Sequence, residues 1–230
     1  MLLESFKAWL RRPSSGDEPL TAASLPRTQP KRDLPAAASR GSLGLDEFFG
    51  RLSSRSSLRI LDLSGASQAN IDFALQYGHQ LYCEDFLGTM TELFGGGDDF
   101  YARQADDEIA SQFLSQTFAS LHGPFDGALL WDSLQFLESP LLDHAIGHLH
   151  RLMEPGAPLF AFFPADERQR WLTLNNYRIE SAKTMRVIPR AYLRRSHVVN
   201  SRAIERMFSD FANVKFFLTR DHWREVVVRR

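Results

Sequence analysis

The sequence predicts an α/β protein with a mixed seven-stranded sheet, helices on both faces of that sheet and an antiparallel hairpin at its C-terminus. Three observations lead to this prediction. Short apolar runs alternate with helical patterns between residues 42 and 165, which is typical of a parallel sheet covered on both sides. The run LRILDL at 58–63 is apolar on both faces, as in a buried parallel strand. The last residues, VKFFLTRDHWREVVVRR at 214–230, read as two strands joined by a tight turn, so the sheet is mixed.

The first half of the domain alternates as a parallel sheet requires. The expected elements are a helix at 43–52, the strand at 58–63, a helix at 67–78, a second strand at 79–85, a helix at 88–94 and a third strand at 100–105 (FYARQA). Apolar residues recur at helical intervals in the first helix, and Gly78 is expected to end the second. The turn GGGDD separates the last two elements.

The second half continues the alternation and then breaks it. The expected elements are a helix at 107–118, a fourth strand at 125–134, a helix at 139–153, a fifth strand at 154–164 and a helix at 201–211 before the terminal hairpin. Ser139 is expected to cap its helix with Pro140 at the first helical position, and Asn200 or Ser201 to open the last helix. Between them, YRIESAKTMRVIPR at 177–190 alternates like an exposed strand or hairpin.

Composition limits the class of protein. The chain has 230 residues, 43% of them hydrophobic, which suits one folded domain with additional segments. The single cysteine, Cys83, excludes an internal disulfide framework and a cysteine-rich metal site, and a reducing cytoplasmic setting is the simplest fit. No apolar run approaches the roughly 18 residues needed to span a bilayer, and the N-terminus lacks a signal-peptide pattern.

Residues 1–41 are expected to lie outside the folded domain of residues 42–230. Apolar and basic residues at 2–12 (LLESFKAWLRR) alternate as in a short amphipathic helix, which can bind a membrane surface weakly, occupy a partner's groove or pack back on the domain. Residues 13–41 are rich in Pro, Ser and Ala without an apolar period, which indicates a flexible linker.

Charge is distributed unevenly along the chain. Residues 42–167 carry 5 Lys/Arg and 19 Asp/Glu, a net of −14, whereas residues 168–206 carry 10 and 2, a net of +8. The basic block overlaps an insert at about 165–199. Either it docks on its own acidic domain, or it binds an anionic acceptor or partner. Nucleic acid is not expected, because the sequence pI is about 6.7 and no binding motif is present.

Successive motifs resemble those of the class I S-adenosylmethionine-dependent methyltransferases. They are ILDLSGASQ (60–68), CED (83–85), QAD (104–106), FDGALLWDSLQFL (125–137), LHRLMEPGAPLFAFF (149–163) and RDHWREVVVRR (220–230). The resemblance covers about residues 43–165 and 198–230. It implies a Rossmann-like fold, S-adenosylmethionine as cofactor and a methyltransferase reaction.

The candidate cofactor residues follow from strand ends and from the resemblance. Ligands of open α/β sheets bind beyond the carboxyl ends of strands, where the strand order reverses. Gly65 permits close approach of backbone, and Asp85, 20 residues later, stands where a carboxylate accepts both ribose hydroxyls, with Glu84 as the alternative. The resemblance places Asp106 near the adenine amine. The full set of candidate cofactor residues is Asp62, Ser64, Gly65, Ala66, Glu84, Asp85, Asp106 and Asp132.

The first loop departs from the family pattern D-x-G-x-G-x-G. Ser64, Ala66 and Gln68 replace the glycines, and Gly65 is displaced by one. Positive φ at such residues costs roughly 1–2 kcal/mol each, and a total of about 2–4 kcal/mol would weaken binding about 30- to 1000-fold. Alternatively the turn has rearranged, with the amides of Gln68 and Asn70 making new polar contacts.

Two functions of different class remain open from the sequence. The first is a methyltransferase acting on an unidentified acceptor, with an anionic compound as one option. The second is a catalytically inactive methyltransferase-like binding or regulatory protein. A nicotinamide oxidoreductase is disfavoured, because the G-x-G-x-x-G pattern is missing. No general base stands out, although Asp132, His197 and Tyr192 are candidates. No metal is expected at His144, His148 and His150, because a third ligand at suitable spacing is not evident.

Overall fold

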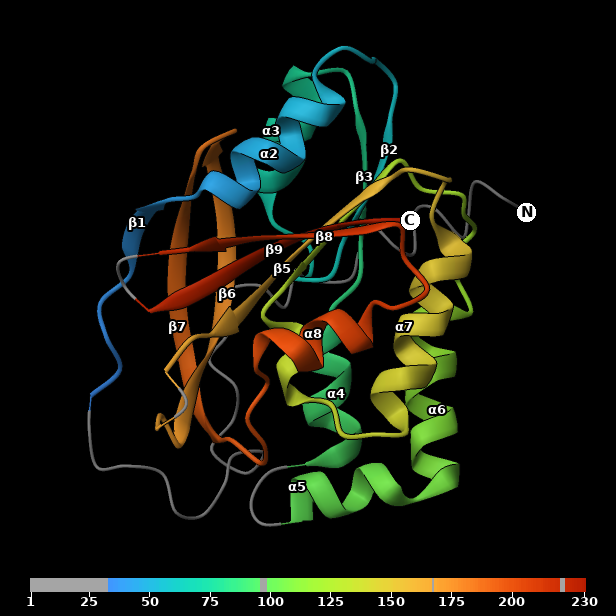
Figure 1. Cartoon of the computed structure of the whole chain (residues 1–230), viewed down its shortest axis with the longest axis vertical. Coiled ribbons are helices and arrows are strands. Elements are labelled where there is room, and N and C mark those ends of the chain that lie inside the picture. The colour runs from blue at the N-terminus through green and yellow to red at the C-terminus, as the bar shows by residue number, and fades with distance from the viewer. Residues whose placement is uncertain (1–32, 96–98, 167, 220–221) are drawn as a thin grey trace.

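The computed structural model of the chain describes residues 33–95, 99–166, 168–219 and 222–230 (Figure 1). The amphipathic helix expected at 2–12 and most of the linker lie outside these residues. In the described part of the chain, no helix has the length and apolar character required to cross a membrane.

A six-stranded mixed sheet forms the centre of the fold. Its strands lie in the order β3 (Gln80–Cys83), β2 (Arg59–Asp62), β4 (Gly127–Trp131), β5 (Pro158–Pro164), β9 (Trp223–Arg229) and β8 (Asn213–Leu218). The first four are parallel, and the β8–β9 hairpin is antiparallel, as the sequence predicts. The chain runs outward from β2 to β3 and then returns to β4 on the other side of β2. The strand order therefore reverses between β2 and β4.

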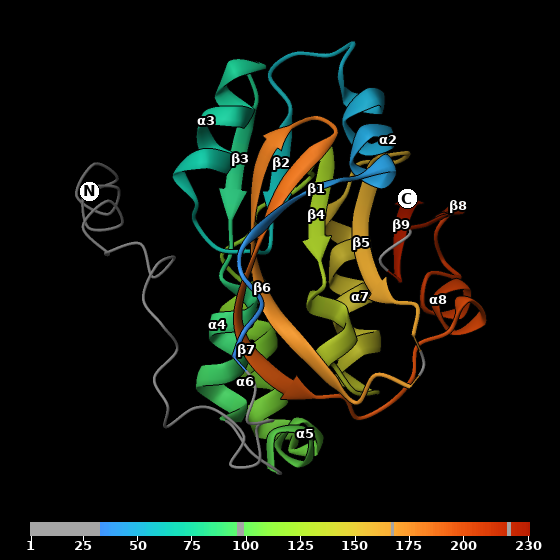
Figure 2. The same cartoon turned by 90° about the vertical axis from the view of Figure 1, so that its left-hand side faces the viewer.

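A second, three-stranded antiparallel sheet is built mainly from the insert. Its order is β1 (Ala38–Gly41), β7 (Thr184–Arg194) and β6 (Trp171–Ser181). The alternation at 177–190 predicted an exposed strand or a hairpin, and the structure has a hairpin there. Figure 2 shows this small sheet crossing in front of the central one.

Helices cover the central sheet on both faces. They are α2 (Leu43–Leu52), α3 (Gln68–Gln76), α4 (Phe86–Phe94), α5 (Asp99–Ala102), α6 (Asp107–Phe118), α7 (Leu141–Leu152) and α8 (Ser201–Met207), with short 3-10 helices η2 (Arg103–Ala105) and η3 (Ser133–Phe136). One core cluster joins the sheet to α4, α6, α7, α8 and one part of the small sheet, through Leu172, Leu174, Ala191 and Leu193. The other joins it to α2, α3 and the rest of the small sheet, through Tyr177, Ile179 and Met185. The small sheet therefore takes part in the core of the domain.

The third strand expected at 100–105 is wrong, and the central sheet has six strands instead of seven. These residues form α5 and η2. Phe100 is fully buried against Phe94, and the buried Gln104 side chain donates to the Phe136 carbonyl at 2.9 Å and accepts from the Glu138 amide at 2.8 Å. The segment is thus fixed by side-chain packing and amide hydrogen bonds, and it does not pair with β3.

The start of α7 also differs from the prediction. The helix begins at Leu141 with Pro140 as its N-cap, one residue later than expected, and no side chain caps it. By contrast, Asn200 caps α8 as predicted, with its side chain accepting from the Ala203 amide at 2.9 Å.

Helix α2 offers a matched test of packing. A Cβ added at Gly44 would lie 2.6 Å from Phe160 Cε2, whereas one added at Gly50 would have no neighbour within 4 Å. We expect Gly44→Ala to destabilise the protein by about 1–3 kcal/mol, because the core cannot accept the methyl group without moving. Gly50→Ala should instead stabilise the helix by about 0.5–1 kcal/mol. Urea denaturation of both variants checks this, and equal effects would contradict the packing of α2 on β5.

Candidate functional site

The candidate site lies at the carboxyl ends of β2 and β4, where the strand order reverses. This is the place at which open α/β sheets bind their ligands. The loop after β2 and the turn after β4 are therefore adjacent, because the two strands pair directly from Ile60↔Gly127 to Asp62↔Leu129. Strand β6 of the small sheet packs against α3 and against the turn after β4.

Asp62 ends β2 and is fully buried. Its Oδ1 accepts hydrogen bonds from the Ser64 amide (2.9 Å), the Ser64 hydroxyl (2.7 Å) and Trp131 Nε1 (2.6 Å). Its Oδ2 accepts one from Asn70 Nδ2 at 2.8 Å. Burial raises the pKa of this carboxyl group, and these donors offset part of the rise. Asp62 is thus held by groups of the protein itself.

The loop after β2 needs a left-handed backbone conformation at one residue only, and that residue is a glycine. Gly65 takes the left-handed conformation with φ +83°, and Ser64, Ala66 and Gln68 avoid positive φ. The strain that the sequence pattern suggested is therefore absent. Asn70 makes the new polar contacts that a rearranged turn predicted, whereas Gln68 contacts only Asp72 of its own helix, at 2.7 Å.

The carboxylates after β3 border this loop. Asp85 forms an isolated bridge with Ser64, and its Oδ1 accepts from the Gly88 amide at 2.9 Å, so that it caps α4. Glu84 is half-buried and accepts from the Ser120 hydroxyl at 3.3 Å. Burial raises the pKa of Glu84, and the neighbouring Asp85 adds to the rise. The structure thus brings Ser64, Gly65 and Asp85 together, as the sequence predicted.

Asp106 does not join this group through any contact of its side chain. It is the N-cap of α6, and its Oδ1 accepts from the Glu108 amide at 3.0 Å and the Ile109 amide at 3.2 Å. Because the expected third strand is replaced by α5 and η2, the strand end that would place Asp106 beside the first loop does not exist.

Asp132 follows β4 and is the most unusual carboxylate of the site. It is fully buried, its Oδ2 accepts from Asn175 Nδ2 at 2.9 Å, and its Oδ1 has no hydrogen-bond partner among the described residues. Burial raises its pKa to about 7, and the hydrogen bond from Asn175 offsets part of the rise. Asn175 Oδ1 is also buried without such a partner in the described part of the chain. Buried oxygen atoms without partners are costly and commonly mark a functional position or an ordered water.

An aromatic stack joins β4 to β6. The rings of Trp131 and Tyr177 are parallel within 2° with centroids 4.7 Å apart. Trp131 also has φ +53°, a left-handed conformation that costs energy for a bulky residue and occurs mostly at functional positions. Asn70 fastens the same strand, because its Nδ2 donates to the Tyr177 carbonyl (3.2 Å) and its Oδ1 accepts from the Ile179 amide (2.7 Å). Ring stacking and hydrogen bonds therefore hold strand β6 against the candidate site.

Sequence reasoning did not identify Trp131, Asn175 and Tyr177 as site residues. Asn175 and Tyr177 come from the insert, more than 40 residues away from β4 in sequence. The signal available in the sequence was polar and aromatic character at 175 and 177, on the same side of an alternating strand.

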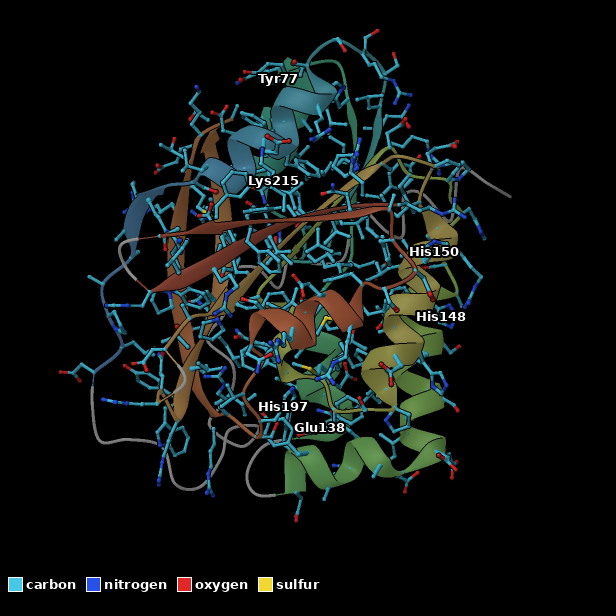
Figure 3. All side chains as sticks on the ribbon, viewed as in Figure 1. Tyr77, Glu138, His148, His150, His197 and Lys215 are labelled. Carbon is cyan, nitrogen blue, oxygen red and sulfur yellow. The ribbon has the colours of Figure 1, made fainter. Side chains whose placement is uncertain are left out.

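The other candidate bases lie elsewhere (Figure 3). His197 Nδ1 lies 3.6 Å from a Glu138 carboxylate oxygen, and Tyr192 donates to the Asp33 carbonyl at 3.4 Å. His148 of α7 stacks on Phe118. Within the described residues, no group of three or more His, Cys, Asp or Glu side chains is placed to hold a metal ion. Asp132 is the one of the three candidate bases that stands at the carboxyl ends of the strands.

Comparisons with known proteins give structural likenesses only. No protein-family model matches the sequence, and no curated protein matches it. The fold is similar to that of a glycopeptide N-methyltransferase complexed with S-adenosylmethionine, with 16% identity, a TM-score of 0.47 and coverage of 88% of this chain and 99% of that one. It is also similar to magnesium protoporphyrin IX methyltransferase from Synechocystis PCC 6803 with bound S-adenosylmethionine, with 16% identity, a TM-score of 0.44 and coverage of 81% and 76%. A third similar structure is a Burkholderia thailandensis 1,6-didemethyltoxoflavin-N1-methyltransferase with bound S-adenosylhomocysteine, with 13% identity, a TM-score of 0.43 and coverage of 81% and 76%. At these levels of similarity, the function has to be argued from the geometry of the chain itself.

Proposed function

We propose that the chain is an S-adenosylmethionine-dependent methyltransferase whose site lies at the carboxyl ends of β2 and β4 and is closed by β6. The observation that carries this proposal is Asp132, a buried carboxylate with one oxygen held by Asn175 and the other without a partner among the described residues. A structural core has little use for such a group, since a neutral side chain would cost less there. A methyltransferase has a use for it, as the base that receives a proton from the acceptor.

The residues around Gly65 fit the adenosine part of the cofactor. Its φ of +83° disfavours any side chain, and an added Cβ would lie 3.5 Å from the Asp85 carboxylate carbon. The Asp85 carboxylate thus lies close to the loop backbone at Gly65, and a carboxylate at this strand end is the group that accepts ribose hydroxyls in such sites. Asp85 or Glu84 would accept from the sugar hydroxyls.

The Asp62 carboxylate cannot bind the cofactor while β6 keeps the position that it has in the structure. Four hydrogen bonds from Ser64, Asn70 and Trp131 occupy its carboxylate. Tyr177 covers Trp131, so the amino acid part of the cofactor needs β6 to move away first. The proposal therefore includes an opening of β6, in which the Asn70 hydrogen bonds to the backbone of β6 break.

Each residue then has a role in the transfer. The cofactor, when bound, supplies an activated methyl group, so the protein chiefly positions the acceptor and excludes water. Asp132 accepts the acceptor's proton at Oδ1, which has no hydrogen-bond partner among the described residues, and Asn175 holds its Oδ2 until β6 opens. Because the pKa of Asp132 is near 7, an appreciable fraction is ionised at neutral pH.

Calorimetric titration of the full chain with S-adenosylmethionine tests the proposal, with two glycine variants as a matched pair. Gly65 and Gly156 have φ values of +83° and +80°, so alanine strains the backbone equally at both, but Gly156 lies in the turn before β5. We expect Gly65→Ala to weaken binding by about tenfold or more, because the added methyl group stands where the loop backbone approaches the cofactor, and Gly156→Ala to leave it unchanged. If wild-type protein gives no heat and no thermal shift at millimolar cofactor, the enzyme proposal fails.

A second candidate function is a catalytically inactive protein that keeps the methyltransferase fold as a binding or regulatory module. The specific observation in its favour is that Asp62 and Asp85 already serve the protein, as the anchor of Trp131 and Asn70 and as the cap of α4. The same titration separates the two candidates, because only the enzyme requires the cofactor to bind.

A further inference from the structure

Gln135 of η3 has a buried amide group that the fold leaves without hydrogen bonds. The residue is 3% exposed, and neither its Nε2 nor its Oε1 has a hydrogen-bond partner among the described residues. No other described residue leaves two buried side-chain polar atoms in this state. A buried amide without hydrogen bonds costs folding stability, so such a group commonly marks the place of a ligand or of an ordered water.

Gln104 shows how the fold treats a glutamine that it needs for its own structure. It is 2% exposed, and its side chain donates to the Phe136 carbonyl at 2.9 Å and accepts from the Glu138 amide at 2.8 Å. Both polar atoms of Gln104 therefore fix the position of η3 and of the residues that follow it. The Gln135 amide has no comparable role in holding the fold together.

Gln135 and Asp132 lie on the same side of η3. Side chains three residues apart in a 3-10 helix lie one above the other, and Asp132 is the N-cap of η3, three positions before Gln135. Between them and beyond, Leu134 and Phe136 pack into the core cluster that includes α4, α6, α7 and α8. Gln135 therefore belongs with Asp132 to the candidate site.

The unpaired atoms of this group favour a ligand that donates hydrogen bonds. Asn175 is part of the group, because its Nδ2 donates to Asp132 Oδ2 at 2.9 Å. The unpaired oxygens are Asp132 Oδ1, Asn175 Oδ1 and Gln135 Oε1, whereas Gln135 Nε2 is the unpaired nitrogen. A carboxylate or phosphate group has acceptor atoms only, so an anion suits these oxygens poorly. An N–H group next to a carbonyl oxygen matches both atoms of the Gln135 amide, in the way that glutamine pairs with the edge of a base.

A flat ring already lies beside this group. Tyr177 stacks on Trp131 with ring centroids 4.7 Å apart, and its hydroxyl oxygen is 3.3 Å from Asn175 Nδ2. The proposed opening of β6 removes this ring and leaves the face of Trp131 uncovered. Because Trp131 directly precedes Asp132, a planar acceptor that stacks on the indole lies next to the carboxylate.

We propose that Gln135 is a specificity-determining residue whose amide binds an uncharged, planar acceptor through an N–H group and an adjacent carbonyl oxygen, as in an aromatic lactam. This inference rests on the proposed function, because the acceptor enters only when β6 opens. The class of acceptor is thereby narrowed, and an anionic compound, one option from the sequence, is disfavoured.

Thermal denaturation of two glutamine variants tests whether the Gln135 amide is unpaired in the fold. Methionine is similar to glutamine in shape but lacks its amide group. We expect Gln135→Met to keep the melting temperature or to raise it by up to about 4 °C, because an unsatisfied amide is removed. Gln104→Met, the matched control, should lower it by about 4 °C or more, because two backbone groups lose their partner. A lower melting temperature in Gln135→Met would overturn the inference.

Binding of small probes tests the class of acceptor. The probes are carbostyril, which is a bicyclic aromatic lactam, its N-methyl derivative, which lacks the N–H group, and quinaldate, which is an anion of similar size. Saturation-transfer NMR measures their affinities for the full chain in millimolar S-adenosylhomocysteine. We expect wild-type protein to bind carbostyril at least about tenfold more tightly than either other probe. In Gln135→Met this preference should fall to about threefold or less.

Calorimetric titration with S-adenosylhomocysteine separates this inference from the proposed function. If wild-type protein binds S-adenosylhomocysteine but binds carbostyril no more tightly than the other probes, the acceptor class is wrong and the methyltransferase proposal stands. If it does not bind S-adenosylhomocysteine, the methyltransferase proposal fails and this inference fails with it. Gln135→Met should bind S-adenosylhomocysteine within about threefold of wild type. A loss of about tenfold or more would assign Gln135 to the cofactor and overturn its role toward the acceptor.

Discussion

Asp132→Asn is expected to stabilise the protein above neutral pH and to remove part of its pH dependence. The pKa of Asp132 is about 7 in the folded protein, against an ordinary value of 3.8. A carboxyl group whose pKa is raised on folding adds stability at pH values below its unfolded pKa, and this stability is lost as the pH rises through the folded pKa. Three pKa units correspond to about 4 kcal/mol. Asparagine keeps the shape and an oxygen atom for Asn175, but it has no proton to lose.

The measurement is urea denaturation of wild type and variant at about pH 5 and about pH 8. The variant should gain about 2–3 kcal/mol relative to wild type between these two conditions, because part of the effect is already present at pH 5. The comparison isolates Asp132, because Asp62 and Glu84, whose pKa values are also raised, remain in both proteins. Asp210→Asn, at an exposed position, is the control and should show no such gain. Parallel stability curves for wild type and the Asp132 variant would show that Asp132 is not a strained acid.

Asn70→Ala is expected to cost about 3–5 kcal/mol of folding stability. Asn70 is fully buried and bonds to Asp62, to the Tyr177 carbonyl and to the Ile179 amide. Its removal leaves three buried polar groups short of a partner, at roughly 1–3 kcal/mol each before relaxation. The loss should appear in urea denaturation and, by hydrogen exchange, as reduced protection of the Ile179 amide.

Gln68→Ala on the same helix is the matched control. Gln68 is exposed and contacts only Asp72, so its loss should cost no more than about 0.5 kcal/mol. A loss of folding stability below about 1 kcal/mol in Asn70→Ala would contradict the role of the Asn70 hydrogen bonds in holding β6 against α3. Unchanged protection at Ile179 would contradict it as well.

Much of the fold was predictable because it depends on local patterns. The apolar run at 58–63 is long enough to be buried on both faces, and the alternation at 177–190 and the terminal hairpin follow the period of a strand. The third strand was not predictable from its own residues. Phe100 and Gln104 would suit a strand, and the partners that decide against it, Phe94, Phe136 and Glu138, come from other elements.

The site residues that directly follow a strand were predictable from the sequence, whereas the contacts between distant segments were not. Asp62, Ser64, Gly65 and Asp85 follow their strands directly, and the structure assembles them as expected. Asp106 was displaced together with the missing strand. The stack of Trp131 on Tyr177 joins segments 46 residues apart, so its formation depends on how β6 docks, and local sequence periodicity contains no information about that.

The stability cost of the buried Asp132 carboxylate is expected if the protein needs this group for its activity. An acid kept buried with a raised pKa lowers stability at neutral pH, and proteins commonly retain such groups where activity requires them. The strained Trp131 and the unpaired oxygen of Asp132 lie in consecutive residues, directly after β4. Both features are expected to be relieved when β6 opens and the site receives its ligands.

The most direct test of the central claim is a crystal structure of the full chain grown with S-adenosylhomocysteine. The account predicts the adenosine beside the Gly65 loop, with its ribose hydroxyls on Asp85 or Glu84, Tyr177 displaced from Trp131 and the hydrogen bonds from Asn70 to β6 broken. Crystals that contain no ligand at this position after growth in millimolar S-adenosylhomocysteine, with Tyr177 still stacked on Trp131, would contradict it.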